Sequence, residues 1–283
     1  MSNSNHLQRL QTHWDWRAAG NFICGGAGSG LLAFTCLHAT DSPLALPLIA
    51  LGLALVGLGL FSVWLEIGRP WRALNVFVHW RHSWMSREAI AAVVLFALGL
   101  GLLAGMRWRA WPTAAAALAF LYCQLRILAA ARGIPAWRGP STAALLATTA
   151  LTEGVGLASI AAAWHPGTQA TAALALTTLV VARLLLWEAW RVRIEATAGP
   201  VANRICRRMA PVARWAATAL PLALTLASLG GAPAGPALLA LAGVMALASG
   251  AAFKYLLITR LSHHQGYALP RMPVRGVPRM TAR

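Results

Sequence analysis

Long apolar stretches alternate with short polar connections along the whole chain. A helix needs roughly 20 apolar residues to cross the hydrocarbon core of a bilayer, and eight stretches reach about that length. They are Ala18–Leu37, Leu44–Leu65, Glu88–Met106, Trp111–Ala129, Thr142–Ala163, Ala170–Trp190, Val212–Leu229 and Pro236–Thr259. This pattern predicts an all-α integral membrane protein with eight transmembrane helices, grouped as two four-helix bundles. Tryptophans at the ends of the stretches, Trp187 and Trp190 among them, predict an aromatic belt.

The composition agrees with a membrane protein. Hydrophobic residues make up 58% of the 283 residues and charged residues 11%, less than half of the roughly 25% in soluble domains. A soluble fold of this length could not bury so much apolar surface. A bilayer removes this difficulty, because lipid replaces water as the solvent for apolar side chains.

The polar connections are rich in arginine on one side of the predicted membrane. The connections of the other side contain two arginines, Arg107 and Arg109. Because cytoplasmic connections carry the excess of Lys and Arg, we expect both termini in the cytoplasm and the chain in a bacterial or archaeal cytoplasmic membrane. Topology also accounts for the net charge of +17, so we expect no nucleic-acid partner. Residues 1–265 form the predicted anchor domain, and residues 266–283 form a Pro- and Arg-rich cytoplasmic tail.

A glycine-rich run, Gly25-Gly26-Ala27-Gly28-Ser29-Gly30, lies inside the first apolar stretch. No strand precedes it, and no acidic residue follows at the distance that a dinucleotide-binding fingerprint requires. Small residues let neighbouring helices approach closely. We therefore predict tight helix packing along this run.

Ionisable side chains within the apolar stretches are candidates for function, because a charge at membrane depth is costly. Glu153 lies near the middle of the fifth stretch. It serves either as a hydrogen-bond partner of a neighbouring helix or as one step of a proton path. Arg183, Glu188 and Lys254 are expected to extend to the interface or to form pairs.

The cysteines and histidines give no sign of a metal centre in this chain. The four cysteines form no CxxC motif, which argues against a cluster. No histidine lies in the middle of an apolar stretch, where a bis-histidine haem would need paired imidazoles. We expect no metal ligands, no haem and no iron–sulfur cluster here, and expect any such centre to belong to a partner.

The second connection combines carboxylates with arginines at one membrane face. Glu66 ends the second stretch, and a turn with the sequence GRPWRA follows at residues 68–73. Ser86 is expected to cap the third helix, with Glu88 in its first turn. These carboxylates either exchange protons with a quinol or belong to a salt-bridge belt at the headgroup level.

Three local motifs resemble those of a known family. They are Gly68-Arg69-Pro70-Trp71-Arg72-Ala73, Ser86-Arg87-Glu88, and Arg126 followed by Gly133-Ile134-Pro135-Ala136-Trp137 and Pro140. With the eight-span pattern, they make the chain similar to the DMSO reductase anchor subunit family (DmsC/NrfD-like proteins), membrane subunits of complex iron–sulfur molybdoenzymes. The resemblance implies an anchor for a ferredoxin-like iron–sulfur subunit. That subunit passes electrons between a membrane quinone, ubiquinone or menaquinone, and a molybdopterin or tungstopterin catalytic subunit.

The resemblance also implies a quinone pocket where the first four helices meet. Glu88 corresponds to the family's acidic residue at the start of the third helix, Arg126 to the arginine before the Pro-x-Trp turn, and Asn21 to a polar position of the first helix. This chain has Glu66 where the DMSO reductase anchors carry a histidine, and Leu128 where they carry a tyrosine. With a nearby tyrosine included, the expected quinone-binding residues are Asn21, Glu66, Glu88, Tyr122 and Arg126.

A partner subunit is expected on the arginine-rich side. The residues predicted to contact it are Trp16, Arg17, Arg69, Arg72, Arg81 and Trp137. Because these positions lie on the predicted cytoplasmic face, we expect the catalytic subunit to face the cytoplasm. Its substrate would then be intracellular, for example a coenzyme A thioester such as an arylacetyl-CoA.

Two other functions fit an eight-span protein. A proton-coupled secondary transporter would use Glu153 and Arg183 as coupling residues, and it predicts broken helices and an inverted repeat, which the sequence does not show. A passive anchor would hold the same partners without a quinone site.

Overall fold

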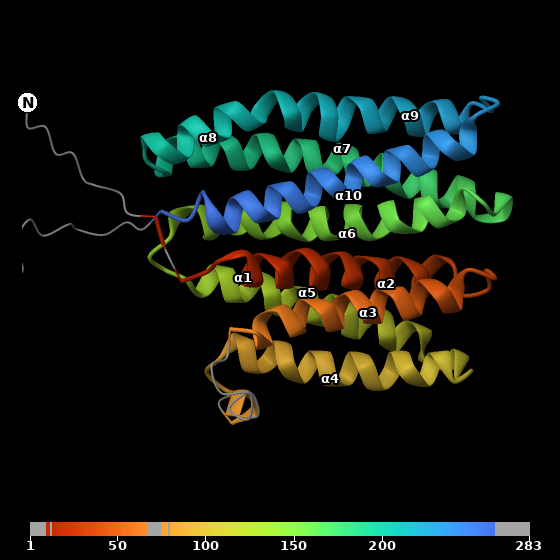
Figure 1. Ribbon diagram of the computed structural model, residues 1–283, viewed down its shortest axis with the longest axis horizontal. Helices are drawn as coiled ribbons and strands as arrows, with labels where there is room; N and C mark the ends of the chain where they lie inside the picture. Colours follow the sequence, from red (N-terminus) through yellow and green to blue (C-terminus); the bar gives the residue numbers. More distant parts are fainter. Residues whose placement is uncertain (1–9, 12, 67–74, 79, 264–283) are drawn as a thin grey trace, which may run out of the picture.

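The computed structural model describes residues 10–11, 13–66, 75–78 and 80–263. These ranges contain eight helices that are long and apolar enough to cross a membrane, and they lie side by side in Figure 1. The prediction of an all-helical protein with eight candidate spans is confirmed.

The first half of the chain contains four spans. The first is a continuous helix of three segments, α1 (Trp16–Gly20), η1 (Asn21–Gly25) and α2 (Gly26–His38), of which η1 is π-helical. The next three spans are α3 (Ala45–Trp64), α4 (Trp84–Leu103) and α5 (Ala110–Ala130), and the 3₁₀ turn η3 (Arg107–Arg109) precedes α5.

The second half begins after the 3₁₀ turn η4 (Pro135–Trp137) and also contains four spans. The fifth and sixth are α6 (Pro140–Ala162) and α7 (Pro166–Thr197). The seventh is a continuous helix of α8 (Pro200–Pro211), the π-helical η5 (Val212–Ala219) and α9 (Leu220–Leu229), and the eighth is α10 (Gly235–Thr259).

Proline and glycine mark several helix ends. Pro140, Pro166 and Pro200 begin α6, α7 and α8, where a fixed φ is favourable and no intrahelical donor is needed. Gly105 and Gly139 have φ values of 91° and 100°. Only glycine adopts this region without strain, which lets the chain turn sharply between spans.

Three predicted helix boundaries are corrected. The cap of α4 is Ser83, whose Oγ accepts from the backbone nitrogen of Ser86 at 3.4 Å, so Ser86 lies inside the first turn and Glu88 lies in the second, not the first. The sixth span continues past its predicted end to Thr197, and the seventh begins at Pro200 instead of Val212. Both extensions are polar, so the apolar pattern does not reveal them.

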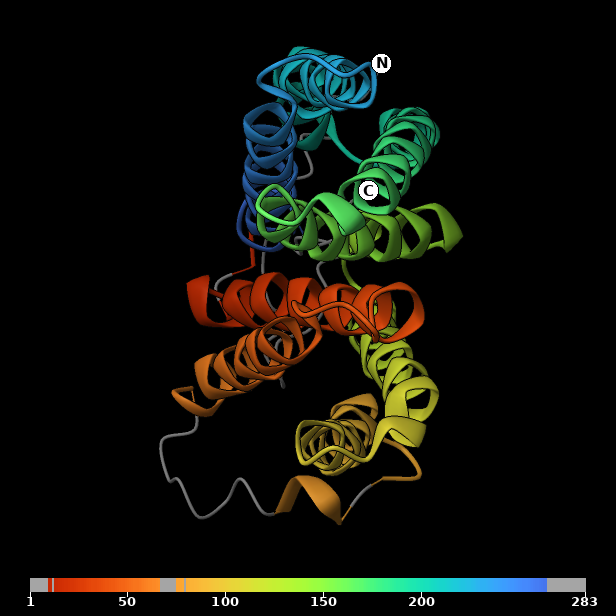
Figure 2. The ribbon, with the colours of Figure 1, turned by 90° about the vertical axis from the view of Figure 1, so that its right-hand side faces the viewer.

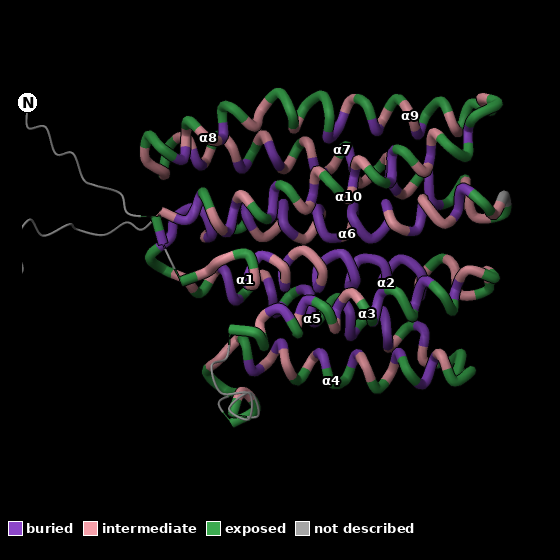
Figure 3. Tube along the Cα trace, in the orientation of Figure 1, coloured by how far each residue is buried: buried purple, intermediate pink, exposed green. Residues whose placement is uncertain are grey.

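α2 and α6 form the centre of the molecule. α2 packs against α3, α5 and α6, and α6 packs against α7 and α10. The first four spans lie on one side of the α2–α6 contact and the last four on the other (Figures 1 and 2). Burial follows this order, as Figure 3 shows: in the most apolar stretch of each span, 78% of the residues are buried in the first and 22% in the seventh.

Glycines allow the α2–α6 contact. A Cβ added to Gly30 would overlap the carbonyl group of Ala150, and one added to Gly154 would overlap the backbone of Gly30 and Leu31. On the opposite side of α2, a Cβ at Gly28 would lie 2.6 Å from the carbonyl oxygen of Gly52. The predicted tight packing along the glycine-rich run is therefore confirmed.

The Gly154→Ala variant should be less stable than the wild-type protein by about 1–3 kcal/mol, because the added methyl group forces α2 and α6 apart. Gly167→Ala is the matched control, since a Cβ there meets no atom within 4 Å. The thermal unfolding midpoint in detergent measures both. Equal midpoints for the two variants would contradict the close contact.

The two described ends of the chain meet at one end of the molecule. The backbone nitrogen of Gln11 donates to the carbonyl oxygen of Ser262 at 2.9 Å. We call this end, which contains residues 10–11, 13–15, 65–66, 131–139, 198–199 and 260–263, the terminal face. We call the opposite end, with residues 39–44, 104–109, 163–165 and 230–234, the far face. Among these far-face residues, Arg107 and Arg109 are the only arginines.

Candidate functional site

Two of the predicted quinone-binding residues meet inside the first four spans. The Glu88 side chain is 5% exposed, and the Asn21 Nδ2 donates to its Oε1 at 3.1 Å. Gln124, buried on α5, donates from Nε2 to the carbonyl oxygen of Asn21 at 3.1 Å and lies 3.4 Å from its Oδ1. We call Asn21, Glu88 and Gln124 the amide–carboxylate cluster. It joins the first, third and fourth spans in the half of the molecule nearer the terminal face.

Gln124 is the residue that sequence reasoning missed. It lies two residues after Tyr122 and two before Arg126, both of which were expected in the pocket. Unlike Glu153 and the other ionisable side chains expected to be functional inside the spans, Gln124 is uncharged. An uncharged amide in an otherwise apolar helix was a second signal, because a buried amide also needs hydrogen-bond partners.

The π-helical segment η1 positions the cluster. It begins at Asn21, and π-helical turns frequently occur at functional sites. A Cβ at Gly25 would lie 2.6 Å from the Gln124 Nε2, and a Cβ at Gly59 would lie 2.8 Å from the Gly25 nitrogen. These glycines therefore let α3 and α5 approach the first span closely enough for Gln124 to reach Asn21.

Glu88 has no ion pair among the described residues. Arg87, its neighbour in sequence, donates to the carbonyl oxygens of Trp80 and Arg81 at 3.1 and 2.7 Å. The carboxyl group is thus held by amide hydrogen bonds. Because a buried charge without a cation is costly, Glu88 is the strongest candidate for proton chemistry in the first four spans.

Tyr122 and Arg126 lie on a different face of α5. They are separated from Gln124 by about 200° around the helix, and both contact Trp84 on α4. The Arg126 and Arg87 guanidinium groups lie 4.7 and 4.3 Å from the Trp84 ring centroid, and the Tyr122 ring meets Trp84 edge-to-face at 5.8 Å. We call these four residues the Trp84 group.

A cavity of about 490 Å³ lies beside the Trp84 group, between α5 and α6. This volume is within the range of about 300–1,000 Å³ typical of small-molecule sites. Tyr122 and Arg126 contribute its functional groups, and alanines form most of the remaining wall. Tyr122 is 52% exposed, so the cavity opens toward the lipid. An apolar chain can lie there with a polar head near Arg126.

Glu66 belongs to a third group, at the terminal face. Arg17 forms an ion pair with Asp15 at 2.8 Å and donates to the carbonyl oxygen of Leu65 at 3.1 Å. Desolvation by its neighbours raises the pKa of the Glu66 carboxyl group, and the nearby Asp15 carboxylate adds to this rise while Arg17 opposes it. No hydrogen bond joins Glu66 to the amide–carboxylate cluster in the described part of the chain. The predicted quinone-binding residues are therefore distributed over three neighbouring groups.

The predicted partner-binding residues differ in exposure. Trp16 and Arg81 are exposed, and Arg17 is partly exposed near the terminal face. Arg69 and Arg72 lie outside the described residues. Trp137 is 2% exposed and donates from its indole nitrogen to the Leu257 carbonyl oxygen at 2.9 Å. It is a core residue that joins η4 to α10, and we no longer expect it at the partner interface.

Glu153 pairs with Lys254 in the interior of the second half. Both side chains are buried, and the Lys254 Nζ donates to the Glu153 Oε2 between α6 and α10. Lys254 occupies the space that a Cβ at Gly26 would need, so this pair adjoins the first span. The hydrogen bond to a neighbouring helix is confirmed for Glu153, and its role in a proton path stays a prediction.

Glu188 and Arg183, the two other residues of this half that were expected to reach the interface or to form pairs, behave differently from each other. Glu188 pairs with Arg191 and Arg214 at 2.9 and 2.7 Å, as expected. The expectation for Arg183 is wrong, because its side chain is 6% exposed and forms no ion pair among the described residues. It donates instead to the carbonyl oxygens of Ala217 and Ala246 at 2.5 and 3.3 Å.

Comparison with known proteins adds no identity to this geometry. No family model matches the chain, and no curated protein matches its sequence.

Proposed function

We propose that this chain is the membrane anchor and quinone-reactive subunit of an oxidoreductase complex, passing electrons between a partner's iron–sulfur clusters and a membrane quinone. The observation that carries the proposal is the buried Glu88 carboxyl group, held by Asn21 and with no cation beside it among the described residues. Quinone chemistry couples electrons to protons. It therefore requires a group near the quinone that accepts and releases protons, and Glu88 is suited to this role.

The Trp84 group supports a binding position for the quinone. Arg126 and Tyr122 offer hydrogen-bond donors to a ring carbonyl, and the alanine-rich cavity between α5 and α6 offers space for an isoprenoid tail. Trp84 lies one helical turn before Glu88 on α4 and contacts Tyr122 and Arg126. The ring is proposed to lie near Trp84, between the proton-exchanging carboxyl group and the lipid-facing cavity.

The arginines on and next to the terminal face support the partner: Arg132, Arg138 and Arg260 lie on this face, and the segments that adjoin it carry Arg81, Arg204, Arg207 and Arg208. An arginine-rich surface attracts an acidic protein by electrostatic steering, and a ferredoxin-like iron–sulfur subunit docked there would lie near Glu88. By the positive-inside rule, we place this face and both termini in the cytoplasm of a bacterium or archaeon. The molybdopterin or tungstopterin subunit would then act on an intracellular substrate, such as a coenzyme A thioester. We also propose that the spans on either side of the α2–α6 contact form two four-helix bundles.

The experiment that tests the proposal is a pull-down of the subunit from its native membrane in mild detergent, followed by mass spectrometry and metal analysis. We expect a cluster-rich subunit to co-purify with iron and with molybdenum or tungsten. The Arg81→Glu variant, on the terminal-face side, should recover less partner. Arg107→Glu, on the far face, should recover as much as the wild type. A lone, metal-free protein under conditions that preserve known complexes would contradict the proposal.

The Glu153–Lys254 pair favours a second candidate, a proton-coupled secondary transporter, because buried ionisable pairs mark ion pathways in membrane proteins. The purified chain alone would then drive solute uptake into liposomes when a proton gradient is applied. An anchor subunit would show no uptake without its partners.

A further inference from the structure

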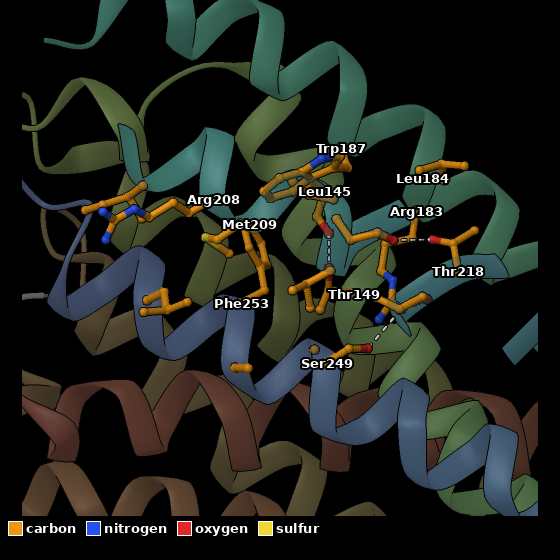
Figure 4. Close-up of a pocket in the computed structure, with 17 residues that line it drawn as sticks. Leu145, Thr149, Arg183, Leu184, Trp187, Arg208, Met209, Thr218, Ser249 and Phe253 are labelled. Carbon is orange, nitrogen blue, oxygen red and sulfur yellow. Dashed lines mark hydrogen bonds between the residues drawn. The ribbon is translucent and has the colours of Figure 1, made fainter. Parts of the chain in front are cut away.

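A cavity of about 330 Å³ lies among the four spans of the second half, away from the residues of the proposed quinone site. α6, α7, α10 and the α8–η5 segment surround it (Figure 4). Its body is apolar, with walls formed by Leu145, Leu184, Trp187, Met209 and Phe253. The volume suits a small molecule or one alkyl chain.

The cavity reaches the lipid between α8–η5 and α10. Val212 and Ala252 line it and are exposed on these two elements. Arg208 lies at one end of the cavity, and Arg183, Thr218 and Ser249 gather at the other (Figure 4). A molecule entering from the bilayer would therefore pass along an apolar wall before it reaches a polar inner end.

The inner end has unused hydrogen-bond donors. A guanidinium group has five N–H donors, and Arg183 uses three, toward the carbonyl oxygens of Ala217 and Ala246 and the Ser249 Oγ, the last at 3.1 Å. The remaining two have no acceptor in the part of the chain that the structure describes. A buried polar group without a partner is costly, so a ligand that accepts these hydrogen bonds would be stabilising.

The charge of the inner end is also unbalanced. Arg183 lies near the buried Glu153–Lys254 pair, which sits behind the cavity wall at Gly250, and the three groups together carry two positive charges and one negative charge, a net charge of +1. The chain has seven acidic side chains, and all seven are described. Apart from Glu153, they are Asp15, Asp41, Glu66, Glu88, Glu188 and Glu195. Glu188 is the nearest of these to Arg183 in sequence, and it is paired with Arg191 and Arg214. An excess positive charge inside a bilayer is costly, so the site favours an anion.

We propose that this cavity binds the carboxylate head of a single-chain amphiphile of the fatty-acid class. The carboxylate accepts a hydrogen bond from an unused Arg183 donor, strengthened by the opposite charges of the two groups. The alkyl chain lies along Trp187, Met209 and Phe253 and leaves toward the lipid between Val212 and Ala252. This site is independent of the quinone chemistry proposed above.

Photo-crosslinking tests the site on the purified full-length chain in lipid nanodiscs. The probe is a palmitic acid with a diazirine in its chain, and mass spectrometry maps the labelled residues. We expect labelling on the cavity walls, competed by palmitate and not by hexadecanol, which has the same chain without the charge. Competition by hexadecanol equal to that by palmitate would overturn the carboxylate assignment. Competition by phosphatidylglycerol alone would show that a phospholipid is the occupant and would also overturn it.

Three variants define the orientation of the ligand. Arg183→Gln should reduce labelling at least about tenfold, the loss expected when a charged hydrogen bond is removed. Ala252→Trp should reduce it similarly by filling the lipid-facing opening, and its exposed position spares the fold. Arg208→Gln should leave labelling within about twofold of the wild type. Loss in Arg208→Gln with none in Arg183→Gln would place the head at the membrane face and refute the proposal. These labelling experiments do not depend on electron transfer. A negative result would therefore overturn the fatty-acid site and leave the quinone proposal untouched.

Discussion

Replacing Glu153 by glutamine should lower the free energy of unfolding by about 3–5 kcal/mol, the usual cost of breaking a buried ion pair by removing one partner. The reason is specific to this interior. Without Glu153, Lys254 and Arg183 remain buried as two cations with no carboxylate near them. Denaturant or thermal unfolding in a defined detergent measures the loss.

Replacing Lys254, the other member of the pair, by methionine should lower the free energy of unfolding by less. In Lys254→Met, Arg183 remains as a cation near Glu153, so the net charge of the interior falls from +1 to zero. Glu188→Gln is the control, because its ion pairs are partly exposed and such pairs contribute about 0–1 kcal/mol. If Glu153→Gln is as stable as this control, or Lys254→Met is the less stable of the two buried variants, the charge account is wrong.

Replacing Glu88 by glutamine should reduce quinol-linked turnover of the intact complex by about 100-fold or more, the lower end of what a general acid or base contributes. Glutamine keeps a carbonyl oxygen that accepts from Asn21, so the fold should be retained. It cannot exchange protons in place of the carboxyl group. The measurement is quinol oxidation or quinone reduction by the purified complex, with kcat and KM determined separately.

Two controls separate chemistry from structure in that experiment. Glu195→Gln changes a carboxylate that pairs with Arg191 near the terminal end of α7, and its turnover should equal that of the wild type. Electron transfer from the catalytic subunit to the iron–sulfur clusters should also be unchanged in Glu88→Gln. Full quinol-linked turnover in a stable Glu88→Gln complex would indicate a passive anchor.

The sequence alone was sufficient for the spans and for the packing of the first helix. Whether a segment can cross a bilayer depends on its length and on the summed hydropathy of its own residues, so the eight spans follow from local composition. The run from Gly25 to Gly30 also acts locally, because the absence of a Cβ allows a close helix contact. The polar helix ends, such as the end of α7 at Thr197, could not be predicted from summed hydropathy.

The tertiary structure decided which side chains meet. Trp187 and Trp190 were expected in an aromatic belt, yet both are buried against Phe253. Gln124 became part of the candidate site because its face of α5 points toward Asn21. Arg183 lies inside because the neighbouring helices offer it carbonyl oxygens.

The physical reason is the solvent. In water, an apolar stripe on a helix marks the face that packs against the core. In a bilayer, lipid tails are as apolar as the protein interior, so both faces of a span have similar side chains and the pattern does not distinguish them. The sequence therefore determines that these helices cross the membrane, and only their packing determines which faces turn inward.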